Sequence, residues 1–379
     1  MREEYTSLGL MSGTSADGVD ASIILSNGVD KYEVIIDKFY EYDKEIKLNI
    51  HSLKQKIHNK THIKKLSKDL KDLERKITIF HAKAIEDLSS NNEVNIIGFH
   101  GQTIYHNSGE KISYQLGDAK LLSQLSKKDI VYNFRQNDID NGGEGAPLTP
   151  IFHQLIASKL KIELPLCILN IGGISNVTII KDPIGSLNFT SKDIGPGNCL
   201  IDSWVRNNSN LDYDKDGNLA LKGTRNEIIF EQAQELFFNR PNQNTLSFDV
   251  NDFDVSFARG LSLEDGSATL TDFTASIIGT ALTNLLQNEK NKIYKVLLCG
   301  GGRKNSILIE KIKQNTLNNI ILQSIDDYGI DGDFVESQAF AFLAIRTMKG
   351  LPITFPDTTG CSKPVTGGKI ISTQKIEFK

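Results

Sequence analysis

Residues 8–25 read LGLMSGTSADGVDASIIL, in which two apolar, strand-like segments flank a turn rich in glycine and hydroxyl groups. Gly13 and Gly18 can adopt positive φ and let a ligand approach the backbone, while the hydroxyls of Ser12 and Ser15 can bind phosphate oxygens. The pattern is not a Walker loop, because an apolar strand follows the turn and no Gly-x-x-x-x-Gly-Lys-Ser/Thr motif occurs. The turn is either a phosphate-binding site or an ordinary tight turn. The candidate phosphate-binding residues are Gly13, Thr14, Ser15, Ala16, Asp17, Gly18, Val19 and Asp20.

The same pattern of strand, glycine turn and strand returns about half a chain later, in residues 166–180. Gly172 and Gly173 occupy this second turn and are candidate phosphate-binding residues as well. Two such hairpins can hold a polyphosphate from both sides, so the repeat favours the phosphate-binding interpretation of the first turn.

Composition and length indicate an ordinary globular protein of two domains, since 379 residues are long for one core. The 43 Lys and Arg against 47 Asp and Glu give a net charge of −4, which offers no attraction to nucleic acid or to an anionic membrane. The four cysteines form no Cys-x-x-Cys site and are expected to be free thiols in a reducing compartment. No apolar run of membrane-spanning length and no signal-like start occur, so we expect a cytoplasmic location.

Apolar residues recur at steps of three and four through residues 43–90, which predicts two helices that meet near Asn59. The segment is rich in lysine, but acidic residues stand between the lysines. We therefore expect a solvent-exposed face rather than a nucleic-acid site.

The sequence His-Gly-Gln-Thr at residues 100–103 ends a predicted strand, where open α/β sheets bind their ligands. Gln102 and Thr103 present an amide and a hydroxyl beside a glycine, a combination that suits recognition of sugar hydroxyls. Both are candidate substrate contacts.

Three charged residues are further substrate candidates. Arg135 precedes the glycine-dense loop at residues 142–147, which also carries Glu144. Such a loop is a hinge, a substrate wall or a plain turn, and the charged residues favour the first two. Glu336 falls in the first turn of a predicted apolar helix, where the helix dipole favours a carboxylate, in either a structural or a substrate-binding role.

Asp193 is the candidate catalytic residue. It precedes a Gly195-Pro196-Gly197 turn and a helix predicted to begin at Cys199. A carboxylate held by a rigid turn near a helix N-terminus is well placed as a general base, and the alternative is a helix-capping aspartate.

Gly300, Gly301 and Gly302 follow a predicted strand and precede a helix that begins at Asn305 or Ser306. Glycines at such a position let a purine or ribose lie against the backbone. After two phosphate hairpins, they predict a nucleotide-binding turn.

Six segments, spread in order over essentially the whole chain, together resemble the anhydro-N-acetylmuramic acid kinase family: residues 9–20, 100–103, 142–148, 170–173, 193–198 and 299–302. Two positions depart from the family pattern. Glu144 stands where Gln is usual, and Asn133 stands where Asp is usual. Both lie by the expected sugar pocket, so they affect the expected substrate contacts more than the reaction.

The resemblance implies an actin-like, sugar-kinase-type α/β fold, with duplicated mixed β-sheets flanked by helices and ATP in an interdomain cleft. It implies an N-terminal domain of residues 1–140 with 340–379, a C-terminal domain of residues 141–339, and a homodimer.

The implied reaction hydrolyses the 1,6-anhydro ring of anhydro-N-acetylmuramic acid and transfers the ATP γ-phosphate to O6. The product, N-acetylmuramic acid 6-phosphate, belongs to peptidoglycan recycling. By this match Asp193 deprotonates the attacking water, Gly13 to Asp20 bind the ATP phosphates, and Glu336 holds the sugar. Mg²⁺ is expected to be held mainly through the ATP phosphates. The alternatives are another sugar kinase of the same fold and a non-catalytic, ATP-switched binding protein, which would need no base.

Overall fold

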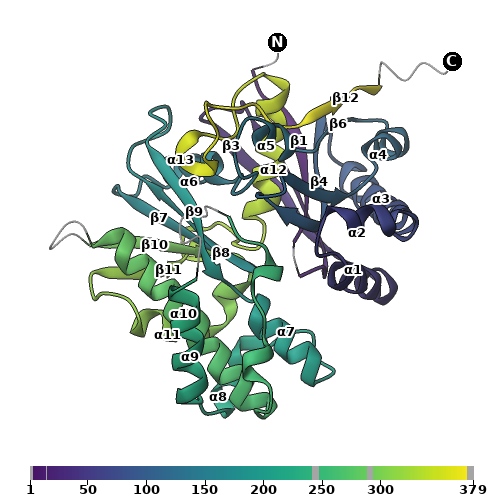
Figure 1. The fold of residues 1–379 in the computed structure, drawn as a ribbon. Helices are drawn as coiled ribbons and strands as arrows, with labels where there is room; N and C mark the ends of the chain where they lie inside the picture. Colours follow the sequence, from purple (N-terminus) through teal and green to yellow (C-terminus); the bar gives the residue numbers. More distant parts are fainter. Residues whose placement is uncertain (1–2, 14, 241–246, 288–292, 374–379) are drawn as a thin grey trace. The chain divides into compact units, whose positions relative to one another are not determined.

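The computed structural model describes residues 3–13, 15–240, 247–287 and 293–373, and the chain divides into two compact units (Figure 1). Unit 1 comprises Met1–Lys161, Asp182–Thr190 and Asp333–Lys379, and unit 2 comprises Ile162–Lys181 and Ser191–Gly332.

Helix α6 (Pro150–Leu160) belongs to unit 1, although the sequence placed this segment in the second domain. The reason is its packing within unit 1. The Phe152 ring of α6 lies 5.0 Å from the ring of Tyr32 and 5.6 Å from that of Phe342, measured between centroids.

The sheet of unit 1 has the strand order β12-β6-β4-β1-β2-β3, and β5 pairs with β4. β1 is antiparallel to β2 and parallel to β4, and β4 is parallel to β6. The strands are β1 (Tyr5–Ser12), β2 (Gly18–Ser26), β3 (Tyr32–Glu41), β4 (Ile96–Asn107), β5 (Ile112–Leu116), β6 (Asp129–Tyr132) and β12 (Lys369–Ile371). The further helices of unit 1 are α1 (Lys44–Lys56), α2 (Lys60–Lys65), α3 (Ser67–Ser89), α4 (Ala119–Ser126), α5 (Gln136–Asp140), α12 (Val335–Met348) and α13 (Pro356–Thr359).

Helix α12 packs closely across one face of this sheet because two neighbouring strands carry glycine beneath it. A Cβ atom on Gly9 of β1 would lie 1.9 Å from the carbonyl oxygen of Ser337, and one on Gly98 of β4 would lie 2.2 Å from that of Phe340. Helix α12 is buried almost throughout, as its apolar sequence predicts.

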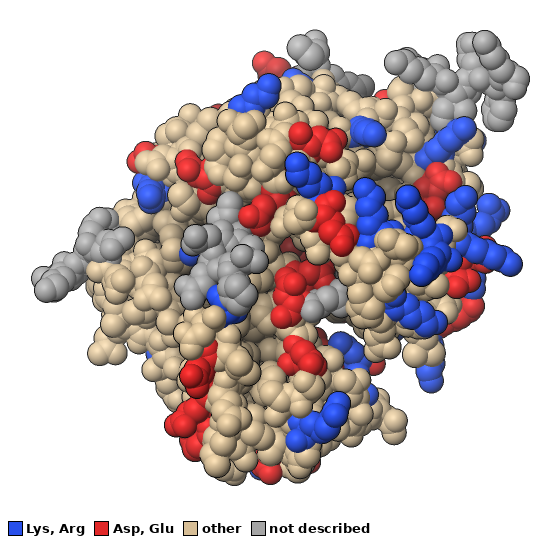
Figure 2. Space-filling model, viewed as in Figure 1, with Lys and Arg blue, Asp and Glu red and all other residues tan. Residues whose placement is uncertain are grey.

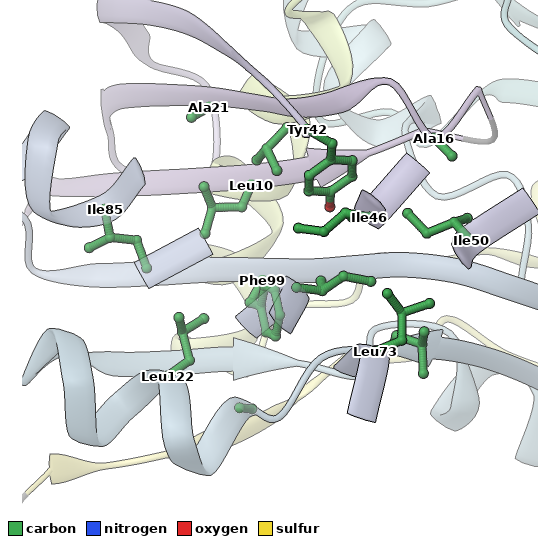
Figure 3. Packing of buried hydrophobic residues seen from close by; sticks show 14 of the residues in the cluster. Leu10, Ala16, Ala21, Tyr42, Ile46, Ile50, Leu73, Ile85, Phe99 and Leu122 are labelled. Carbon is green, nitrogen blue, oxygen red and sulfur yellow. The ribbon is translucent and has the colours of Figure 1, made fainter. Parts of the chain in front are cut away.

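A core on the sheet of unit 1 joins the strands to α1, α3 and α4 (Figure 3). Leu10 from β1, Phe99 from β4, Ile50 from α1 and Leu122 from α4 are all buried members of this cluster. Burial of apolar surface of this kind is the main force that stabilises a fold.

The lysine-rich segment forms three helices instead of the two expected, because the helical run breaks again at Leu66, between α2 and α3. Asn59 caps α2 at the predicted break. Lys and Arg side chains gather over this region, on the right of Figure 2, with acidic side chains between them.

The sheet of unit 2 repeats the order of the first one as β11-β10-β7-β8-β9. β7 is antiparallel to β8 and parallel to β10, which is parallel to β11. The strands are β7 (Leu166–Ile171), β8 (Ile174–Ile180), β9 (Phe189–Pro196), β10 (Tyr294–Cys299) and β11 (Ile320–Ser324). The helices are α7 (Cys199–Asn208), α8 (Asn218–Lys222), α9 (Glu227–Phe238), α10 (Leu263–Leu286) and α11 (Ser306–Gln314), with short 3₁₀ turns η1 (Lys215–Gly217), η2 (Val250–Asp252), η3 (Ser256–Ala258), η4 (Gly301–Lys304) and η5 (Ile325–Tyr328).

The predicted α/β class with duplicated mixed sheets flanked by helices is thus confirmed. All four cysteines are free thiols, also as expected. Within the described ranges, no helix combines the length and apolar character needed to cross a membrane.

Candidate functional site

The turn of the first hairpin follows directly after β1. The left-handed residue in this turn is Ala16, with φ 58°, whereas neither Gly13 nor Gly18 has positive φ, contrary to the sequence expectation. Among the described residues, a Cβ atom on Gly13 would meet only the Ser15 hydroxyl, at 3.7 Å, which leaves open space beside this glycine in that part of the chain. A Cβ atom on Gly18 would lie 2.3 Å from the carbonyl oxygen of Tyr40, so the packing of β3 requires this glycine. Thr14 lies outside the described residues.

The remaining candidates of this turn differ in exposure. The side chains of Ala16 and Val19 are fully buried, which leaves only their backbone to a ligand. Ser15 and Asp17 are exposed, and the Ser15 hydroxyl donates to the Asp17 carboxylate at 2.8 Å. Asp20 is half-buried on β2.

The hydroxyl of Ser12 is unsuited to phosphate, because it is buried and its contacts lie beneath the turn. It lies 2.8 Å from the Tyr42 hydroxyl and 3.3 Å from Nε2 of His81. The expected phosphate contact at Ser12 is therefore wrong.

Gln102 is fully buried and its side-chain amide donates to the carbonyl oxygen of Gly13 at 2.9 Å. It therefore supports the turn, and its burial argues against the expected direct contact with a sugar. Thr103 is half-buried, and its hydroxyl accepts a hydrogen bond from Gln115 at 3.3 Å.

Arg135 links the middle of β4 to the glycine-dense loop, because the strand continues through Asn107 and does not end at residues 100–103 as the sequence predicted. Its Nε and Nη2 donate to Nε2 of His100 at 3.1 and 3.0 Å, and its Nη1 donates to the carbonyl oxygen of Gly145 at 2.8 Å. Burial, reinforced by the nearby Arg135 charge, lowers the pKa of His100 well below its usual value. His100 is thus a neutral ring that donates from Nδ1 to the carbonyl oxygen of Gly101 at 2.7 Å.

The glycine-dense loop is fastened at several points. The buried carboxylate of Asp138 accepts from the amide of Gly145 at 2.7 Å and from the Thr359 hydroxyl at 2.6 Å. The amide of Glu144 donates to the carbonyl oxygen of Thr359 at 2.8 Å. These contacts tie the loop to α5 and α13. Asn133, one of the two departures, has φ 55°, a conformation that asparagine tolerates well.

Glu336 lies in the first turn of α12, as predicted, and its side chain is half-buried. The helix N-terminus favours the ionised carboxylate there.

The turn of the second hairpin accepts hydrogen bonds from the N-terminus of helix α7 in unit 2. The carbonyl oxygen of Gly172 accepts from the amide of Asn198 at 2.8 Å, and that of Gly173 accepts from the amides of Gly197 and Cys199 at 2.9 and 3.2 Å. The hairpin thus satisfies the first amides of α7, which otherwise lack intrahelical partners. A Cβ atom on Gly197 would lie 2.2 Å from the carbonyl oxygen of Gly172, so this approach requires glycine.

Asp193 lies on β9 and is 8% exposed. Its Oδ2 accepts a hydrogen bond from the amide of Phe248 at 2.8 Å. The strand continues through Pro196, so the strand positions Asp193 and the expected Gly-Pro-Gly turn does not form. The amides that begin α7 donate to the hairpin carbonyls, so the side chain does not cap this helix through them.

The three glycines after β10 have different roles. Gly300 has φ 78°, and a Cβ atom on it would lie 2.3 Å from Oδ1 of Asn170, while one on Gly302 would lie 2.2 Å from the Ile171 side chain. A Cβ atom on Gly301 would meet no atom of the described residues within 4 Å. Gly301 is therefore the glycine of the three that leaves room for a ligand. Helix α11 begins at Ser306 with Asn305 as its N-cap, as predicted.

Arg303 fastens this glycine turn and was not singled out from the sequence. Its guanidinium donates to Asp326 at 2.6 and 2.8 Å, to Asp331 at 3.2 Å and to the carbonyl oxygen of Gly300 at 3.1 Å. The bond with Arg303 holds the pKa of Asp326 well below its usual range.

Each of two turns, taken by itself, leaves room for a ligand among the described residues: the turn of Gly13 in unit 1 and the turn of Gly301 in unit 2. In the part of the chain that the structure describes, no three His, Cys, Asp or Glu side chains are grouped so as to hold a metal ion.

The family model and the curated relatives that match this chain carry the same family name. The family model for anhydro-N-acetylmuramic acid kinase matches residues 5–373. The anhydro-N-acetylmuramic acid kinase of Pelagibacter ubique is 52% identical over 98% of this chain and 99% of its own length, and that of Zymomonas mobilis is 35% identical over 96% and 98%. Among solved structures, component A of (R)-2-hydroxyglutaryl-CoA dehydratase from Acidaminococcus fermentans aligns over 91% of this chain and 99% of its own, with 12% identity and a TM-score of 0.45. The chain belongs to the anhydro-N-acetylmuramic acid kinase family.

Proposed function

We propose that this protein is an ATP-dependent kinase that opens the 1,6-anhydro ring of anhydro-N-acetylmuramic acid and phosphorylates O6. Water attacks C1 and the C1–O6 bond breaks. The freed O6 then attacks the γ-phosphorus of ATP, and ADP leaves. The products are N-acetylmuramic acid 6-phosphate and ADP, and the single observation that carries this proposal is the family match over residues 5–373.

Asp193 is the general base that takes the proton from the attacking water. Its burial and the hydrogen bond from the amide of Phe248 support this role, because they fix the carboxylate in one orientation. A water molecule within hydrogen-bond reach of a fixed carboxylate loses its proton as it attacks.

The backbone around Gly13 to Asp20 binds the phosphates of ATP, and Gly301 lies against the nucleoside. The open space beside Gly13 and Gly301 supports these roles, since phosphoryl transfer depends mainly on positioning and charge neutralisation. Gly172 and Gly173 contribute through backbone groups of the second hairpin. Mg²⁺, held mainly through the ATP phosphates, would supply the neutralising charge.

Glu336, Thr103, Arg135 and Glu144 form the sugar-binding group in unit 1. Support comes from the ordered loop that Arg135 and Asp138 fasten, because rigid walls orient a substrate better than mobile ones. We further propose a cytoplasmic location and a homodimer, both of which the family resemblance implies.

A panel of sugars tests the reaction against its alternatives. ADP formation is measured with anhydro-N-acetylmuramic acid, N-acetylmuramic acid, N-acetylglucosamine and glucose. We expect turnover with the anhydro sugar far above that with the others. Equal turnover with glucose would indicate a different sugar kinase, and slow hydrolysis indifferent to every sugar would indicate an ATP-switched binding protein.

A further inference from the structure

Beneath the first hairpin turn, Tyr42 contacts both ends of the five residues Gly13–Asp17. Its backbone amide donates to the carbonyl oxygen of Asp17 at 2.9 Å, and its hydroxyl lies 2.8 Å from the hydroxyl of Ser12, the residue directly before the turn. Figure 3 shows the Tyr42 ring directed into the core beside Leu10. One residue thus fixes where the turn leaves β1 and where it enters β2.

The direction of each hydrogen bond in this network follows from His81. Its Nδ1 lies 2.8 Å from the carbonyl oxygen of Ile77, which can only accept, so Nδ1 carries the proton. Burial lowers the pKa of His81 to about 4, so the ring is neutral and Nε2 is an acceptor. Ser12 therefore donates to Nε2 at 3.3 Å, and Tyr42 donates to Ser12. Burial also raises the pKa of Tyr42, which keeps this donor protonated.

A second support reaches the turn from β4. The buried amide of Gln102 donates to the carbonyl oxygen of Gly13 at 2.9 Å. This bond fixes the carbonyl group of Gly13, and so the backbone where the turn begins.

We propose that Tyr42, with Ser12 and His81, and Gln102 are positioning residues that hold the Gly13–Asp17 turn in the shape that binds the phosphates of ATP. This inference rests on the proposed function, because that function places the phosphates at the turn. The four side chains do not touch the nucleotide, and they act through the backbone of the turn. A preorganised backbone binds more tightly because less order must be imposed on binding.

The test is the Tyr42→Phe variant, which removes one hydroxyl and keeps the ring packing. The matched control is Tyr105→Phe, since Tyr105 is buried in the same core and its hydroxyl donates to the carbonyl oxygen of His58 at 3.4 Å. Binding of Mg-ATP is measured by calorimetry, the KM for each substrate by steady-state kinetics, and the unfolding midpoint by denaturant.

We expect Tyr42→Phe to weaken ATP binding and raise the KM for ATP about threefold to tenfold, the range set by one buried hydrogen bond. The KM for the sugar should not change, and Tyr105→Phe should leave both unchanged. Ser12→Ala should weaken ATP binding at least as much as Tyr42→Phe, because it also removes the bond to His81, and the double variant should be little worse than Ser12→Ala, because both changes break the same bond between Ser12 and Tyr42.

Equal ATP affinity of the two tyrosine variants would overturn the inference, and so would an equal rise in the KM values of ATP and sugar in Tyr42→Phe. Failure of the unmodified protein to bind ATP would overturn it together with the proposed function. The protein could also show no sugar-dependent turnover while Tyr42→Phe binds ATP more weakly than Tyr105→Phe. That result would support the inference and overturn the proposed reaction.

Discussion

The two glycine hairpins share a place in their sheets but differ in what their turns contact. The first turn runs over five residues, Gly13–Asp17, with open space beside Gly13 and supports beneath it. The second turn has only Gly172 and Gly173, and their carbonyl oxygens accept the first amides of α7. Duplication of a sheet therefore did not duplicate the role of its turn. We take the first hairpin as the main phosphate site, and the second as the support of the β9–α7 segment that carries Asp193, with a smaller part in binding phosphate.

The largest expected effect is a loss of turnover when Asp193, on the β9–α7 segment, is replaced. Asp193→Asn keeps the size of the side chain and an oxygen that can accept from the amide of Phe248, but it removes the basicity. Turnover of the anhydro sugar should fall about a hundredfold to ten-thousandfold, the usual contribution of a general base, while ATP and sugar still bind. Steady-state kinetics and calorimetry measure the two effects separately. Near-normal turnover would remove Asp193 from the mechanism, and lost binding with a small change in turnover would give it a structural role.

The second-largest expected effect is on ATP affinity, and it compares the two hairpin turns as phosphate sites. Gly13→Val places a branched side chain in the open space where phosphate is proposed, so ATP binding should be lost, while the backbone needs no positive φ and the fold should persist. Gly172→Ala is the comparison in the second turn, where a Cβ atom would meet only the carbonyl oxygen of Ile174, at 3.5 Å. Unchanged ATP affinity in folded Gly13→Val would remove phosphate from the first turn. Weakened affinity in Gly172→Ala would show that the second turn binds phosphate as well.

Acidification should destabilise unit 1 more than unit 2. All seven histidines lie between residues 51 and 153, hence in unit 1. Burial lowers the pKa of His81 to about 4 and of His106 and His153 to about 3, from 6.5. Below pH 6.5 these histidines bind a proton in the unfolded chain but not yet in the folded protein. The free energy of unfolding therefore falls as the pH drops from 6.5 toward the folded-state pKa values. At about pH 5, each such histidine costs unit 1 about 2 kcal/mol.

Hydrogen exchange measured by mass spectrometry, corrected for the intrinsic effect of pH, reports on each unit separately. Amides of β1, β4 and α3 should lose protection on going from neutral pH to about pH 5. Those of β7, β10 and α10 should keep it. Equal losses in the two units would contradict the assignment of the acid response to buried histidines.

The smallest effect concerns the support of α7. A Cβ atom at Gly197 would collide with the carbonyl oxygen of Gly172 at 2.2 Å, so Gly197→Ala should lower the free energy of unfolding by about 1–3 kcal/mol. Gly301→Ala is the control and should leave stability unchanged, because the new methyl group has no atom of the structurally described segments within 4 Å. Denaturant unfolding measures both. If Gly197→Ala is as stable as the control, the close contact between hairpin and helix is not essential.

The sequence predicted the fold better than the roles of single residues. Strand, glycine turn and strand are local patterns, so both hairpins, their sheets and the start of α11 were found where expected. Burial is not local. Nothing in the sequence around Ser12 or Gln102 shows that their side chains lie beneath the turn instead of above it.

Contacts between distant segments were missed for the same reason. Tyr42 and His81 meet Ser12 only after α3 has packed on the sheet, and Phe248 reaches Asp193 from a separate loop. Arg303 offered a weak signal. An arginine directly after three glycines can hold their turn in place by ion pairs with carboxylates further along the chain, here Asp326 and Asp331.

The central claim, that one protein both opens the anhydro ring with water and phosphorylates O6, has a direct test. The purified protein is incubated with anhydro-N-acetylmuramic acid and ATP in water enriched in oxygen-18, and the product is fragmented in a mass spectrometer. The account predicts N-acetylmuramic acid 6-phosphate with one oxygen-18 atom, at the anomeric carbon, and none in the phosphate group. A product without label at that carbon, or label appearing only in free phosphate, would contradict it.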